Sequence, residues 1–180
     1  MAVYLIDGDN APGTRTKGLQ YLSGTDTVCI CFAKTNKYYL NPEMVKQLRE
    51  TTEAEVRFYR TETNKQAVDF LMAIKAECYI QQGAHEVYLI SGDNHITTIA
   101  TILQKQHTNI KVSRAENIYD GYFGDLDRIS DLNMAKNVLL ELFDEEKGVQ
   151  FYNKLESLLR TEITAKKPEN FWQKMIKAWR

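Results

Sequence analysis

The chain has 180 residues, of which 43% are hydrophobic and 26% charged, and 23 lysine and arginine residues nearly balance 24 aspartate and glutamate residues. This length suits one domain with room for a small appendage. The composition excludes disordered and fibrous proteins, and no apolar run approaches the roughly 18 residues of a membrane-spanning helix. Because the N-terminus has no positive signal-peptide segment, we expect a cytoplasmic protein, away from membranes, with three buried thiols at Cys29, Cys31 and Cys78.

Short apolar runs alternate with helical patterns over the first two thirds of the chain. Most of these runs are apolar throughout, whereas the third alternates as an edge strand does and the fifth is weaker. They occupy residues 3–6, 27–33, 55–59, 87–90 and 109–112. Because such runs bury both of their faces, they predict a parallel sheet covered by helices.

Capping signals mark the segments between these runs as helices. Asn41 followed by Pro42 is typical of a helix start. Residues 63–66 have the spacing of a capping box and open a helix that we expect to end near Gln82, with Gly83 just beyond it. Residues 97–106 suit another helix. The alternation predicts an α/β fold, an open parallel sheet of about five strands flanked by helices.

The pattern changes after the fifth run. Residues 116–130 are predicted to be a loop, and three amphipathic stretches follow. We therefore predict a domain at 1–130 and a C-terminal helical appendage at 131–180. Residues 150–180 carry seven basic and three acidic side chains, which fits either a nucleic-acid contact or a solvated helix face.

The last amphipathic stretch has a dense apolar face. That face holds Phe171, Trp172, Met175, Ile176 and Trp179. An isolated helix of this length is marginal in water, and exposed tryptophans favour aggregation. We therefore expect the face to be buried within the chain or against a second copy in a homodimer.

Three carboxylates are placed to meet at one edge of the predicted sheet. Asp7 follows the first strand, Asp93 follows the fourth, and Asp69 lies in the helix after the third. Ligands of open α/β sheets bind at that edge. Taken singly, Asp7 and Asp93 also suit turns, and Asp93 suits a helix N-cap. Asp69 has no such role among apolar helix residues. Clustered carboxylates require a cation, and oxygen ligands suit Mg²⁺ or Mn²⁺.

The same segments resemble the PIN-like nucleases, particularly their NYN branch. They read Tyr4-Leu5-Ile6-Asp7-Gly8-Asp9-Asn10, Asn64-Lys65-Gln66-Ala67-Val68-Asp69-Phe70 and Val87-Tyr88-Leu89-Ile90-Ser91-Gly92-Asp93. The resemblance covers about residues 2–114. It implies a parallel sheet with helices on both sides and metal-dependent endoribonuclease activity. It also implies that Asp7, Asp69 and Asp93 are the catalytic, metal-binding acids, supported by Asp9, Asn10 and Ser91.

One position departs from that family. A further acid often stands two residues after the position of Asp93, and this chain has His95 there. The sequence leaves open whether His95 binds a metal, contacts a phosphate or is a plain polar residue at a helix start. A fourth acid from Asp125 or Asp127 is likewise left open.

Basic and aromatic side chains surround the predicted acidic centre. Lys34, Lys37 and Tyr38 follow the second strand, Arg60 follows the third, and Lys65 precedes Asp69. Single-stranded nucleic acid is bound by cations that contact phosphates and rings that stack on bases. Solvated lysines and a packed Tyr38 are equally compatible with the pattern. The combined expectation is a Mg²⁺- or Mn²⁺-dependent endoribonuclease that acts on single-stranded RNA.

Two other functions fit parts of the sequence. Asp7-Gly8-Asp9 and Ser91-Gly92-Asp93 also resemble motifs of haloacid-dehalogenase-like phosphatases, but no acid follows Asp93 within five residues and Asp69 would have no role. A PIN-like scaffold that binds nucleic acid or protein without cutting is the second alternative, and His95 is its best support.

Overall fold

The apolar runs form a five-stranded, all-parallel sheet in the order β3-β2-β1-β4-β5. This is a computed structural model, and it describes residues 1–62, 65–123, 149–150 and 153. The strands are β1 (Ala2–Asp7), β2 (Thr27–Ala33), β3 (Glu55–Thr61), β4 (Glu86–Ile90) and β5 (Lys111–Ala115). The predicted α/β fold is confirmed.

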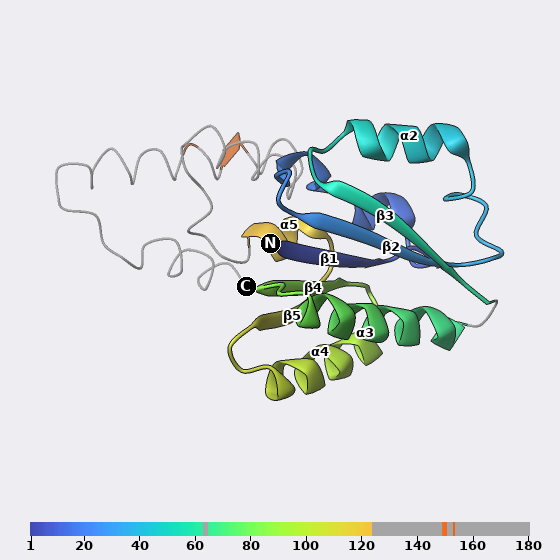
Figure 1. The fold of residues 1–180 in the computed structure, drawn as a ribbon. Helices are drawn as coiled ribbons and strands as arrows, with labels where there is room; N and C mark the ends of the chain where they lie inside the picture. Colours follow the sequence, from blue (N-terminus) through green and yellow to red (C-terminus); the bar gives the residue numbers. More distant parts are fainter. Residues whose placement is uncertain (63–64, 124–148, 151–152, 154–180) are drawn as a thin grey trace. The chain divides into compact units, whose positions relative to one another are not determined.

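Helices cover both faces of the sheet (Figure 1). The helical segments are α1 (Pro12–Arg15), a 3-10 turn η1 (Leu19–Tyr21), α2 (Pro42–Glu50), α3 (Lys65–Gln81), α4 (Asn94–Gln106) and α5 (Ile118–Phe123). One apolar core lies under α3 and α4, and a second lies under η1, α2 and α5. As predicted, Asn41 caps α2 and Pro42 begins it.

The alternation of side chains along β1 determines where its last residue points. Val3 and Leu5 belong to the core under α3, and Tyr4 and Ile6 belong to the core on the other face. Because successive strand residues face opposite sides, Asp7 shares the α3 side with Leu5.

The order of the strands reverses next to β1. The chain continues from β1 to β2 and β3 on one side, and it returns to the other side for β4 and β5. The first and fourth strands are therefore neighbours. The carboxyl ends of β1 and β4 form the switch point at which ligands bind in open α/β sheets.

Several details differ from the sequence-based expectations. The segment predicted to be a loop at 116–130 includes α5, because Ile118 and Tyr122 are four residues apart and both contact the second core. Helix α4 begins at Asn94 rather than at 97, because Asp93 caps it. Cys78 is exposed, whereas Cys29 and Cys31 are buried as expected.

The chain divides into two compact units, Met1–Tyr122 and Phe123–Arg180. Nearly all of the described residues lie in the first unit. The predicted boundary at 130, the acids Asp125 and Asp127, and the predicted helices of 131–180 lie outside the described residues. In the part of the chain that is described, no helix has the length and apolarity to span a bilayer.

Candidate functional site

Asp7 ends β1 and is held from two sides. Its side chain is buried, its Oδ1 accepts a hydrogen bond from the Asp9 amide at 3.1 Å, and its Oδ2 accepts one from the Ser91 hydroxyl at 2.9 Å. Burial raises the pKa of Asp7, although the Ser91 hydrogen bond opposes this rise. The carboxylate thus joins the carboxyl ends of β1 and β4.

Asp93 has a structural role in the loop after β4. Its Oδ1 accepts a hydrogen bond from the His95 amide at 2.9 Å, which makes it the N-cap of α4. Its own amide donates to the Ser91 hydroxyl at 3.1 Å. Ser91 therefore connects Asp93 to Asp7, and the N-cap interpretation is confirmed.

Asp69 lies in the second turn of α3, which packs on β1, β2 and β4. It is half-buried. Burial raises the pKa of Asp69, the charges of Asp7 and Asp93 raise it further, and His95 opposes the rise. Asp7, Asp93 and His95 are thus near enough to Asp69 for their charges to act on its pKa. Among the described residues, no hydrogen bond or ion pair to the Asp69 side chain is present.

The chemistry of this region suits a hard divalent cation. Carboxylate oxygens are the ligands that Mg²⁺ and Mn²⁺ prefer, and the mutual repulsion at Asp69 is what a cation would relieve. Over residues 1–62 and 65–123, however, no three histidine, cysteine, aspartate or glutamate side chains are arranged to enclose a metal ion. The carboxylates share one region but do not form a closed cage.

Asp9 and Asn36 hold the loop that follows β2. The Asp9 carboxylate accepts hydrogen bonds from the Ala33 amide at 3.1 and 3.2 Å and from the Asn36 side chain at 2.8 Å. The same Asn36 amide group donates to the Gly8 carbonyl at 2.9 Å. Asp9 is therefore occupied in fixing the β1 and β2 loops to each other.

Arg15, a basic residue that follows the first motif, is buried. Its guanidinium donates to the Asn10 carbonyl at 3.2 Å, and to the carbonyl and carboxylate of Glu116 at 2.6 and 2.8 Å. Gly92 lies directly against it, because a Cβ at that position would come within 2.2 Å of the Arg15 Nη2. Arg15 therefore links the loops after β1, β4 and β5.

The Arg15 contact connects residues 101 positions apart, so no local pattern signals it. Arg114 adds to the same network, since it donates to the Ser91 carbonyl at 2.9 Å and pairs with Glu116. The Arg15 charge lowers the pKa of Asp7, although burial and Ser91 affect that pKa more. Asn10, predicted to support the acids, accepts hydrogen bonds from Arg15 through its carbonyl and its side chain.

Tyr39 packs against the loop that follows Asp7. Its side chain is 3% exposed, and its hydroxyl has no hydrogen-bond partner among the described residues. A Cβ on Gly8 would lie 2.7 Å from the Tyr39 ring, so only glycine allows this approach. Burial raises the pKa of Tyr39, and the charges of Tyr38, Asp7 and Asp9 add to the effect.

The predicted nucleic-acid contacts are placed unequally. Lys34 forms an ion pair with Glu62, and Tyr38 packs edge-on against Tyr39 with ring centroids 4.9 Å apart. Lys37 and Arg60 are exposed. Lys65 begins α3, and its side chain lies outside the described part of the structure. Lys34 is also exposed, and of the three exposed cations only Lys34 forms an ion pair within the described part of the chain.

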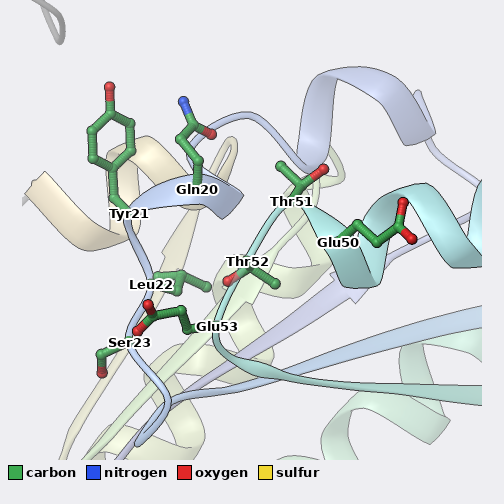
Figure 2. Close-up of a pocket in the computed structure, with 8 residues that line it drawn as sticks. All are labelled: Gln20, Tyr21, Leu22, Ser23, Glu50, Thr51, Thr52 and Glu53. Atoms are coloured by element: carbon green, nitrogen blue, oxygen red, sulfur yellow. The ribbon is translucent and has the colours of Figure 1, made fainter.

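A cavity of about 450 Å³ lies at the amino ends of the strands, where β2 and β3 begin (Figure 2). It contains two carboxylates and no basic side chain, so it does not suit a phosphate. Its lining residues are Gln20, Tyr21, Leu22, Ser23, Glu50, Thr51, Thr52 and Glu53.

Comparisons with known proteins identify no relative. No family model, no curated protein sequence and no solved structure matches the chain. The function of the chain is therefore inferred from its own residues and from its resemblance to PIN-like motifs.

Proposed function

We propose that this protein is a Mg²⁺- or Mn²⁺-dependent endoribonuclease that cleaves single-stranded RNA in the cytoplasm. The observation that supports this proposal is that the charges of Asp7 and Asp93, which follow the neighbouring strands β1 and β4, raise the pKa of Asp69. The order and spacing of the three PIN-like segments agree with it.

The chain's own residues would divide the work at this centre. Asp7, Asp69 and Asp93 would hold the cation through their carboxylates, and Ser91 orients Asp7 with its hydroxyl. When bound, the cation supplies a water of lowered pKa and stabilises the leaving oxygen of the phosphodiester. Arg15 connects the loops after β1, β4 and β5, so that the acids keep their relative positions.

A cleavage assay tests this proposal. The full chain should cleave a labelled single-stranded RNA with Mn²⁺ and should not do so with EDTA. Asp69→Asn should reduce the rate by at least about 100-fold, because loss of even a supporting residue at a metal site costs 10- to 100-fold. Lys105→Gln, an exposed substitution on α4, serves as the control. Cleavage that persists in Asp69→Asn would contradict the proposal.

A second function is favoured by His95 and by the open arrangement of the carboxylates. A PIN-like scaffold would bind RNA or a protein without cutting it, and His95 stands where the family often has another acid. RNA binding with no Mn²⁺-dependent cleavage would identify this function. Inhibition by beryllofluoride, which mimics an aspartyl phosphate, would instead indicate the phosphatase alternative.

A further inference from the structure

Two cations and an aromatic ring line the α3 side of β3. Arg57 and Tyr59 alternate with residues of the opposite face, and both contact Tyr79 of α3 through hydrogen bonds of 3.0 Å. The Lys75 ammonium of α3 lies 4.0 Å from the centroid of the Tyr59 ring. Because β3 is the edge strand of the described sheet, these side chains border solvent.

This group shares a sheet face with the acidic centre. Tyr59 pairs in register with Cys31, and Cys31 pairs with Asp7. Two strand spacings separate Tyr59 from Asp7, which is about 10 Å. Burial raises the pKa of Cys31, with Lys75 opposing the rise and Asp7 adding to it, so both charges lie near this thiol.

Within the described part of the chain, no carboxylate forms an ion pair with Lys75. Among the described residues, its ammonium contacts the Tyr59 ring and forms no ion pair. Arg57 pairs with Glu55 at 2.7 Å, but its side chain remains 41% exposed. An ammonium over an aromatic ring is held there by electrostatic attraction to the face of the ring.

We propose that Lys75 and Arg57 bind the phosphate backbone of single-stranded RNA beside the scissile bond, with the Tyr59 ring positioning Lys75. This inference rests on the proposed nuclease function. It adds a binding surface on the α3 side of β3 to the exposed cations Lys37 and Arg60. The strand would pass along the β3 edge before its scissile phosphate reaches the carboxylates.

Binding measurements at several salt concentrations test this surface. We would follow the fluorescence anisotropy of a labelled single-stranded RNA with the full chain in EDTA, where no cleavage occurs. Lys75→Gln should reduce the slope of log affinity against log salt by about 0.7 and weaken binding about fivefold at 0.1 M salt. Arg57→Gln should act in the same direction, and Lys75→Arg should restore the slope.

The control is Lys105→Gln, on α4, which packs on β5 at the far edge of the sheet. It should keep the affinity and slope of the wild type. If Lys75→Gln also keeps both while the wild type still cleaves RNA and Asp69→Asn does not, this surface is wrong and the nuclease function stands. A wild-type chain with no affinity for RNA would overturn both proposals.

Discussion

At the scale of single residues, the main feature is the electrostatic repulsion that Asp7 and Asp93 exert on Asp69. Burial and the charges of Asp7 and Asp93 raise the pKa of Asp69, so its ionised form is disfavoured in the folded protein. In EDTA at neutral pH, Asp69→Asn should therefore raise the free energy of unfolding measured in urea. With Mn²⁺ at about 100 times its Kd, the wild type should gain about 2.7 kcal/mol and the variant should not.

The pH dependence of this difference follows from the direction of the shift. A carboxyl whose pKa is raised by folding binds its proton more tightly in the folded state, so its contribution to stability falls as pH rises. The advantage of Asp69→Asn should be absent below about pH 4, the ordinary pKa range of aspartate, and should grow as pH rises through the raised value. An advantage that is the same at pH 4 and pH 7.5 would contradict the electrostatic explanation.

Arg15 gives a second prediction at this scale. Arg15→Ala leaves the carbonyls of Asn10 and Glu116 without their donor, and each such loss costs about 1–3 kcal/mol. The free energy of unfolding in urea should fall by at least that amount. The matched control is Arg60→Ala, an exposed arginine whose removal should change stability by no more than about 0.5 kcal/mol. Equal effects of the two substitutions would show that the hydrogen bonds of Arg15 do not stabilise the fold.

The sequence indicated which acids influence one another better than it indicated the hydrogen bonds around them. Asp7, Asp69 and Asp93 could be placed together because each follows a strand, or the helix after one, at the same edge. The hydrogen bonds of Asp9 to Ala33 and of Arg15 to Glu116 could not be predicted, because they join distant segments through the final packing.

At the scale of the helix, Asp93 has two separable roles. Its carboxylate caps α4, and it is also a proposed metal ligand. Serine caps a helix about as well as aspartate does but carries no charge. Asp93→Ser should therefore keep the melting temperature near that of the wild type while weakening Mn²⁺ binding at least about 10-fold.

Asp93→Ala is the companion variant, and it should also lower the free energy of unfolding by about 1 kcal/mol. Calorimetric titration with Mn²⁺ and thermal melts in EDTA separate the two effects. Full Mn²⁺ affinity in Asp93→Ser would show that Asp93 only caps the helix.

The extents of the helices show why prediction works for some elements and not others. Helix α2 could be predicted from Asn41 and Pro42, because capping is a local interaction. Helix α5 has only six residues, too few for a periodic pattern, and it is stabilised by contacts of Ile118 with the core. Its formation depends on the sheet being in place.

At the scale of the whole molecule, the role of the C-terminal residues stays a sequence-based prediction. The apolar face that includes Phe171, Trp172 and Trp179 should be buried within the chain or against a second copy. Truncation after Ile163 should then lower the melting temperature or change the mass measured by light scattering. Mn²⁺ binding should be retained, since the proposed ligands belong to β1, α3 and the start of α4. An unchanged mass and melting temperature with weaker RNA binding would identify the tail as a nucleic-acid arm.

The central claim, that three carboxylates hold one divalent cation, is tested most directly by crystals grown with Mn²⁺. Anomalous diffraction at the manganese edge should show a peak with carboxylate oxygens of Asp7, Asp69 and Asp93 at about 2.0–2.6 Å, the range of oxygen ligands to hard cations. No peak at the carboxyl ends of β1 and β4, or a peak bound only by other residues, would contradict the claim.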